Sequence, residues 1–366
     1  MKKIIVAVAA LALMTGSAYA AEWNFYGSAR VSTFWADGDV DGIDEWDDLD
    51  NYMEDVQFEE ALQSNARIGA KVKVSDELTG RFEYGSSGGS ANIRLLYGEW
   101  NFGAGKLLVG QDYVPLNLFG SNQVYLTDGA LEGYGGEMYG GRAAQLKLTF
   151  GDFQIAVVEN NTNYYAGGGA VDANVDVVIP MIEVKYALTV DNFVITMAGG
   201  YQTFDVDNGT VDDDVTSWGL GLDVAATFGA MSITAQVNGG TNIGNLCYID
   251  VTGFSSGTDA IGAGYAAIDG SDVIDNDAMG ARLVVGYTFN DMFGVEVGYG
   301  YQQTEYDDSR FDDEIESQSY YIQFPITLAP GVHVVPELGV VDYNKDDLDA
   351  GQEEITYFGA KWQINF

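Results

Sequence analysis

Aspartates concentrate in the stretch "DGDVDGIDEWDD" at residues 37–48, and side chains of this kind could bind a metal ion. They alternate at its start, a glycine follows, and a further aspartate closes it. Calcium loops use this spacing because alternate carboxylates converge on one cation and the glycine allows a sharp turn. The closing position is usually a bidentate glutamate, so the match is partial. The predicted calcium ligands are Asp37, Asp39, Asp41 and Asp48.

Acid–base and nucleophilic chemistry have few candidates. His333 is the only histidine and Cys247 the only cysteine, so the chain cannot form an internal disulfide. A histidine general base must lie beside the nucleophile that it activates. His333 comes two residues after the short turn "APG" at 329–331, away from the long loops described below. We therefore predict that the protein is not an enzyme and needs no cofactor, with loop-bound Ca²⁺ or Mg²⁺ as the one alternative.

The first twenty residues have the pattern of a secretory signal peptide. Two lysines precede an apolar run at 4–14, and Ala18-Tyr19-Ala20 supplies a cleavage site. We predict that residues 1–20 are removed and that 21–366 form one domain. Loss of the two lysines changes the formal charge from −39 to −41. A charge of this sign argues against nucleic acid as a partner and favours cations near the surface.

The elements that must position these residues are strands. In "TYFGAKWQINF" at 356–366, apolar and polar side chains alternate strictly, which predicts a strand with one apolar face. About ten residues is also the length of a tilted transmembrane strand. The same alternation recurs at 23–33, 65–74, 145–150, 218–228, 282–289 and 320–328.

The connections alternate between short and long. Short turns fall at 74–80, 102–106, 151–152, 191–192, 229–230, 290–292 and 329–331. Long polar loops fall at 36–63, 85–92, 112–143, 160–179, 205–216, 240–277, 303–316 and 342–353. This pattern predicts an all-β fold, a transmembrane antiparallel up-and-down β-barrel of sixteen strands with short periplasmic turns and long acidic extracellular loops. The alternative is a soluble all-β protein, in which turns need not sort by length.

Aromatic side chains fall where the two membrane interfaces are expected. One group lies near the short turns and comprises Trp23, Phe150, Phe153, Phe228, Phe289, Phe293 and Phe366. A second group lies near the long loops and comprises Tyr201, Trp218, Tyr301 and Tyr320. Two such girdles around an apolar band are typical of a barrel that faces lipid.

The sequence resembles the Gram-negative general porins, the trimeric sixteen-stranded diffusion channels of the outer membrane. The similar stretches are "SNARIGAKVKVSDELTGRFEYG" at 64–85, "NIRLLYGEWNFGAGKLLVGQD" at 92–112 and the terminal "KWQINF". One departure is Gln111, where the family commonly has a further basic residue. The resemblance implies an outer-membrane location, a homotrimer, and lipid and lipopolysaccharide as partners. It also implies that the barrel-assembly machinery reads a terminal signal made of Trp362, Ile364 and Phe366.

A barrel of this size encloses water rather than a filled core, so charges on its inner face would set selectivity. The basic residues on the polar faces are Arg30, Arg67, Lys71, Lys73, Arg81, Lys147 and Arg282. In the porins that the chain resembles, the third loop folds into the barrel, which implies that 112–143 narrows this pore. Its acids, which would face the arginines, are Asp112, Asp128, Glu132 and Glu137.

We therefore predict a channel for passive diffusion of small hydrophilic solutes and ions, with a preference for cations because of the charge of −41. Two alternatives stay open: a channel specific for a sugar or an anion, and an adhesin that uses the long loops. Acidic stretches at 205–214, 269–277, 307–316 and 346–354 accompany the first one and would form a ring of carboxylates at the mouth.

Overall fold

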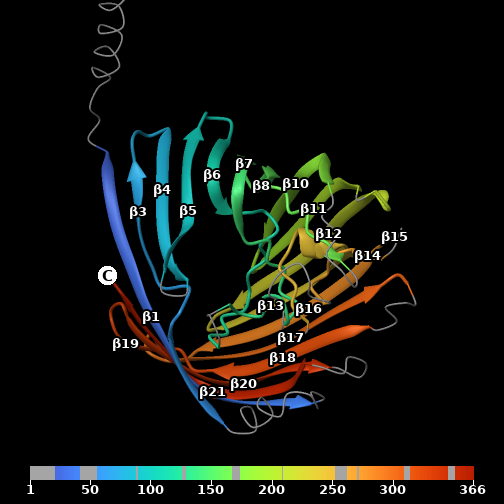
Figure 1. Ribbon diagram of the computed structural model, residues 1–366. Coiled ribbons are helices and arrows are strands. Elements are labelled where there is room, and N and C mark those ends of the chain that lie inside the picture. Colours follow the sequence, from blue (N-terminus) through green and yellow to red (C-terminus); the bar gives the residue numbers. More distant parts are fainter. Residues whose placement is uncertain are drawn as a thin grey trace, which may run out of the picture.

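Long antiparallel strands curve round and close into a single barrel (Figure 1). The computed structural model describes residues 21–41, 56–87, 90–125, 129–166, 174–207, 209–251, 262–269, 272–308, 314–344 and 351–366. The barrel strands are β1 (Glu22–Asp41), β2 (Gln57–Leu62), β3 (Arg67–Lys73), β4 (Leu78–Ser87), β5 (Ser90–Asn101), β6 (Lys106–Tyr113), β7 (Arg142–Phe150), β8 (Phe153–Val158), β10 (Asn174–Val190), β11 (Phe193–Asp207), β12 (Asp212–Phe228), β13 (Met231–Thr241), β16 (Asn276–Thr288), β17 (Gly294–Tyr306), β18 (Ile315–Gln323), β19 (Ile326–Ala329), β20 (Val332–Asn344) and β21 (Gly351–Asn365).

The eighteen strands of this sheet correspond to sixteen barrel strands, because two of the sixteen are each interrupted once. β2 and β3 pair with successive parts of β1, and β18 and β19 pair with successive parts of β20, so each couple is one interrupted strand. Pro325 causes the second interruption because proline has no backbone N–H to donate. β1 pairs with β21, from Ser28 opposite Asn365 to Asp41 opposite Gly351, and this pairing closes the barrel. The predicted sixteen-strand fold is confirmed.

Short turns join the strands at one end of the barrel. The two-residue turns at 151–152, 191–192 and 229–230 each begin in the left-handed region, with φ of 59° at Gly151, 51° at Asp191 and 62° at Gly229. Such turns match the right-handed twist of the strands that they join, and glycine adopts them without strain. These three turns lie where the sequence predicts them.

The strands are longer at the other end than the alternation predicts. β1 continues to Asp41, and β11 and β12 remain paired from Asp205–Asp214 to Asp207–Asp212. At this end of β11 the buried side chains are the apolar Phe204 and Val206, and Asp205 and Asp207 alternate with them, so the apolar-outward pattern ends although the hydrogen-bonded ladder continues. A second small sheet joins two predicted loops through β9 (Tyr165–Ala166), β14 (Ala267–Asp269) and β15 (Asp272–Ile274). The 3₁₀ helix η1 (Ile243–Asn245) lies between β13 and β14.

The two faces of the barrel have opposite character. Outward side chains are large and apolar, as Ile68, Leu220 and Trp362 illustrate, and these three are 58%, 61% and 51% exposed. Inward side chains include buried polar groups such as Gln302 and Ser317. An apolar exterior and a polar interior reverse the order of a water-soluble protein and fit a barrel surrounded by lipid. Among the described residues, no helix is long and apolar enough to cross a membrane.

Candidate functional site

The segment between β6 and β7 lies inside the barrel against its inner wall (Figure 1). The Leu116 N–H donates to Glu183 of β10 at 2.9 Å, and the Val124 N–H donates to Glu337 of β20 at 2.8 Å. The Gln123 amide donates to the Tyr357 hydroxyl of β21 at 2.7 Å. The segment, which we call the inserted segment (114–141), therefore spans the lumen from β10 to β21.

Carboxylates hold the backbone of the inserted segment. Glu183 and Glu337 receive three of its N–H groups, those of residues 116, 124 and 125. Glu296 of β17 accepts from both the backbone and the side chain of Asn122. A chain without a strand partner must find other acceptors for its backbone donors. Side-chain oxygens on three strands of the wall supply these acceptors.

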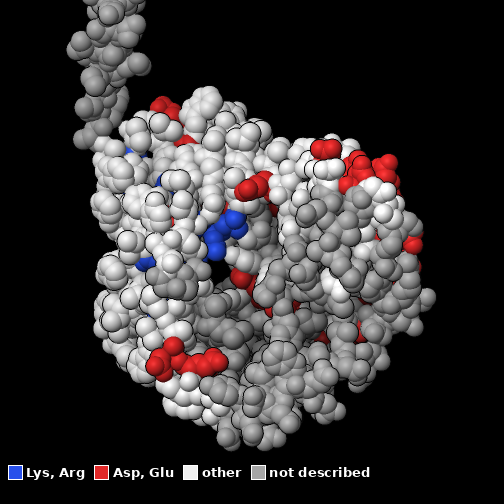
Figure 2. All heavy atoms as spheres, in the orientation of Figure 1, with Lys and Arg blue, Asp and Glu red and all other residues white. Residues whose placement is uncertain are grey.

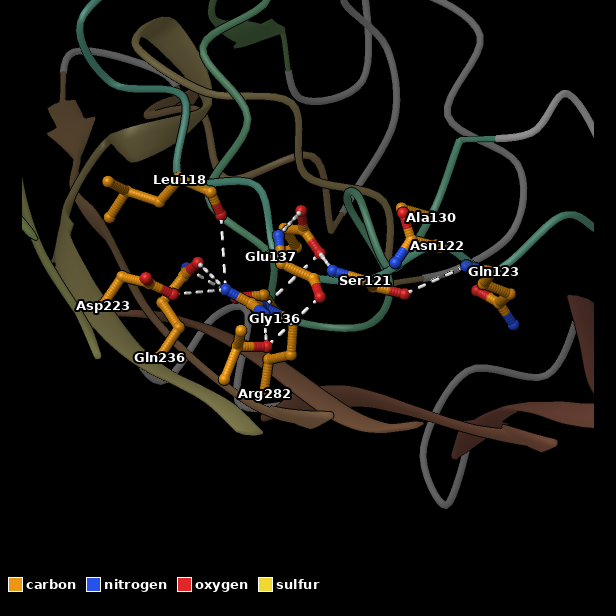
Figure 3. A network of polar contacts seen from close by, with 12 residues as sticks. Leu118, Ser121, Asn122, Gln123, Ala130, Gly136, Glu137, Asp223, Gln236 and Arg282 are labelled. Atoms are coloured by element: carbon orange, nitrogen blue, oxygen red, sulfur yellow. Dashed lines mark hydrogen bonds and ion pairs between the residues drawn. The ribbon is translucent and has the colours of Figure 1, made fainter. Parts of the chain in front are cut away.

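Arg282 of β16 ties the middle of the inserted segment to the wall (Figure 3). Its guanidinium lies 2.5 Å from Asp223 of β12 and 3.4 Å from Glu137 of the segment. Glu137 in turn accepts the N–H groups of Gly120 and Ser121. A side chain at position 120 would collide with the Arg282 guanidinium, so only glycine permits this close approach.

This network corrects two predicted roles. Arg282 is on the inner face, as predicted, but the segment covers its side chain completely, so it does not line open water. Glu137 is equally covered and pairs with Arg282 instead of facing Arg30, Arg67 or Arg81. Burial raises the pKa of Glu137 to about 7, although Arg282 opposes this rise. Both side chains therefore serve to dock the segment through the contacts that they make.

A cavity of about 410 Å³ lies in the lumen beside the inserted segment. Figure 2 shows Lys and Arg side chains gathered at the hollow in the middle of the molecule. The charged residues that line this cavity, which we call the basic cavity, are Arg30, Arg67, Arg94, Arg142, Lys361 and Glu132. Tyr113, Phe119 and Tyr139 supply aromatic rings. Positive charge thus exceeds negative charge among the lining residues.

Glu83 of β4 organises the arginines of the wall. Arg67, Arg81 and Arg94 lie 3.5, 3.1 and 2.8 Å from its two oxygens, and the Tyr26 hydroxyl donates to it at 2.8 Å. One carboxylate therefore serves three guanidinium groups. Of the predicted basic wall, Arg30 and Arg67 line the basic cavity, and Arg81 shares the Glu83 site.

Sequence reasoning missed Glu83, Arg94 and Arg142. Arg94 stands between Ile93 and Leu95, where strict alternation does not assign it to the polar face. The register between β4 and β5 shifts at Glu83/Tyr84, and this bulge turns Arg94 inward. A charged residue inside an apolar strand is the signal that could have found it.

The remaining predicted charges lie outside the basic cavity, apart from Glu132, which lines it. Lys71, Lys73 and Arg81 line a second cavity of about 510 Å³, and Lys73 pairs with Asp76 at 2.8 Å. Asp112 belongs to β6 rather than to the loop, and it binds Lys147 at 2.8 Å with both side chains largely covered. Asp128 lies outside the described residues.

The predicted calcium ligands are only partly described. Asp37 is exposed and lies in β1, whose backbone pairs with β21 from residue 37 to residue 41. The first part of the acidic stretch is therefore extended strand rather than loop. Asp48 and the side chains of Asp39 and Asp41 lie outside the described part of the chain. Within that part, no three histidine, cysteine or acidic side chains gather as a metal site.

A closed sixteen-strand barrel with an apolar exterior, a polar interior and a segment folded into its lumen is a transmembrane β-barrel of porin fold. Solved structures of similar fold support this class. The outer membrane channel DcaP of Acinetobacter baumannii is 17% identical with a TM-score of 0.72, over 94% of this chain and 97% of that one.

Two further structures are Gram-negative porins. OmpF of Salmonella typhi, in complex with daunomycin, is 14% identical with a TM-score of 0.62, over 93% of this chain and 97% of that one. An anion-selective porin of Comamonas acidovorans is 12% identical with a TM-score of 0.59, over 94% and 100%. No protein-family model and no curated protein match the sequence. The chain thus has the fold of Gram-negative outer-membrane porins, and an outer-membrane location is consistent with that fold.

Proposed function

We propose that the protein is a water-filled outer-membrane channel for passive diffusion of small hydrophilic solutes and ions. The observation that carries this proposal is the polar lumen with its basic cavity beside a firmly anchored segment. A barrel of sixteen strands is too wide for its own side chains to fill. In this proposal the inserted segment is the constriction, and its anchoring to β10, β17 and β20 keeps the opening fixed.

Ion selectivity has two opposing sources in this channel. The charge of −41 supports the predicted preference for cations, which would arise in the acidic loops at the mouth. The basic cavity supports the alternative of an anion channel, because charges at the narrowest part act on every permeating ion. We infer that the mouth collects cations whereas the cavity favours anions. One structural neighbour, from Comamonas acidovorans, is described as anion-selective.

Reversal potentials at two salt concentrations separate these sources. The Debye length falls from about 10 Å at 0.1 M salt to about 3 Å at 1 M, which screens exposed loop charges more than charges in a narrow cavity. We expect the reversal potential of the purified protein in planar bilayers to shift toward anion preference at high salt. A cation preference that persists at high salt would contradict the proposed role of the cavity, and absence of any conductance would refute the channel itself.

The assembly is also a proposal. We infer a homotrimer in contact with lipid and lipopolysaccharide, assembled by the barrel-assembly machinery through the terminal strand. One structural neighbour, OmpT of Vibrio cholerae, is described in a trimer form. Trp362, Ile364 and Phe366 all point outward from β21 and its end, where another protein could bind them. Chemical cross-linking in native membranes would show whether three copies associate.

Three other roles have less support. The adhesin alternative requires that deletion of the long loops abolish cell binding. An enzymatic role is not proposed, because His333 lies beside a short turn with Thr327 3.3 Å away, remote from the long loops. Calcium binding by Asp37, Asp39, Asp41 and Asp48 stays a prediction, and calorimetry without a calcium-dependent heat would dispose of it.

A further inference from the structure

Basic side chains outnumber acidic ones among the described residues that line the basic cavity. Glu83 is shared by Arg67, Arg81 and Arg94, so one negative charge faces three positive ones. Arg142 adds another guanidinium, and Glu132 is the one acidic side chain among the described residues that line the cavity with it. Partly desolvated cations of this kind attract an anion more strongly than cations in bulk water do.

Two of these arginines are held side by side. Arg94 and Arg142 come from β5 and β7, and each donates to the same acceptor, the Tyr113 hydroxyl, at 3.1 Å. The Arg142 guanidinium also stacks over the Tyr113 ring, 5.2 Å from its centre. Arginine has five N–H donors in a planar fork that matches a carboxylate, so both side chains retain donors for a ligand.

An apolar ring lies beside these charges. Phe119 of the inserted segment lines the basic cavity and is 50% exposed, although it is inside the barrel and away from lipid. Tyr113 contacts it edge-on at 5.4 Å between ring centres, and Tyr139 lies 5.8 Å away. Its neighbours in the chain are fixed, because the Leu118 N–H donates to Met138 and the Gly120 N–H to Glu137. A half-exposed ring held rigidly in water offers a surface for an apolar ligand group.

We propose that the basic cavity is a binding site for small aromatic carboxylates on their way through the channel. The carboxylate would pair with the guanidinium groups of Arg94 and Arg142, and the aromatic ring would pack on Phe119. The volume of about 410 Å³ suits a solute of this size. This proposal rests on the channel function proposed above and adds a class of solute to it.

Single-channel recording in planar bilayers tests the proposal with sodium benzoate and sodium acetate as probes. Benzoate is expected to interrupt the chloride current at millimolar concentration, whereas acetate, which lacks the ring, is expected to pass without resolved interruptions. In Phe119→Leu the current should persist, and the benzoate dissociation constant should rise about fivefold. This factor corresponds to the loss of one aromatic contact of roughly 1 kcal/mol. In Arg142→Gln the interruptions should be lost.

Lys106→Gln is the matched control. It also removes one positive charge, but Lys106 pairs with Glu99 on the exposed part of β6, outside the basic cavity. Benzoate binding should therefore remain as in the unaltered protein. Equal effects of benzoate and acetate, or unchanged benzoate binding in Phe119→Leu, would overturn the aromatic carboxylate site while leaving the channel intact. A protein without any conductance would instead refute the channel.

Discussion

At the scale of single residues, the fully covered Arg282 illustrates how this barrel uses charge. Asp223 and Glu137 both approach its guanidinium, which also donates to Thr234 and Gln236. Removing one partner from a buried ion pair leaves the other charges uncompensated, which costs more than the pair itself contributes. Arg282 therefore controls whether the inserted segment can remain docked.

We predict that Arg282→Met releases the middle of the inserted segment. The loss leaves two covered carboxylates without a cation, at a cost of about 3–5 kcal/mol to docking. Open-channel current should become larger and noisier, and the folded barrel should melt at a lower temperature. Lys106→Gln, which breaks an exposed pair, should cost less than about 1 kcal/mol and leave both measurements unchanged. A quiet channel of unaltered conductance would show that the network does not hold the segment.

Residue roles could be predicted only in part from the sequence. Alternation assigns Arg30 and Arg67 to the inner face because each lies within a regular strand. It misses Arg94, because a bulge shifts the register there. It also cannot tell that Arg282 is covered, since the covering atoms come from residues more than a hundred positions earlier in the chain.

At the scale of elements, the inserted segment depends on acceptors that strands far apart in the sequence provide. Glu183, Glu296 and Glu337 come from β10, β17 and β20, and each binds a different part of the segment. The sequence predicted a loop at 112–143 but not these partners, because contacts of such long range depend on how the barrel closes. The strand lengths were underestimated for a simpler reason, since at the loop end of β11 the apolar side chains Phe204 and Val206 lie on the buried face instead of the outward one.

Docking of the inserted segment should depend on pH through Glu137. Burial raises its pKa to about 7 in the docked state, against roughly 4.3 for an exposed glutamate. The docked state then binds more protons between these values, so docking weakens as the pH rises from about 4.3 to 7. Arg282 of β16 and Asp223 of β12 face the same carboxyl group and act on it in opposite directions.

Current noise as a function of pH measures this effect. We expect the noise of the open channel to rise between pH 5 and 8, because the segment docks less firmly when Glu137 is charged. Glu137→Gln carries no titratable group and should show a flatter profile over the same range. Noise that grows as the pH falls would contradict the assigned direction.

At the scale of the whole molecule, the pairing of β1 with β21 closes the barrel, and we call this pairing the seam. β1 and β21 are far apart in the sequence but pair along most of their lengths. The terminal residue completes the seam, since Gly27 donates to Phe366 at 2.7 Å and Phe366 donates to Gly27 at 3.0 Å. The fold was predictable because the alternation of side chains and the alternation of turn lengths repeat along the chain. The register between β1 and β21 could not be predicted in this way.

Deletion of Phe366 should impair closure and insertion more than it impairs the finished barrel. It removes two backbone hydrogen bonds at the seam and an outward ring that is 74% exposed, which in our proposal the assembly machinery binds. We expect a lower yield of heat-resistant folded protein in the outer membrane. Gln363→Ala changes a polar residue of the same strand whose side chain bonds only locally to Asn365, so its yield should match the unaltered protein. Equal yields for both variants would mean that the seam closes without its last residue and that the terminal ring carries no assembly signal.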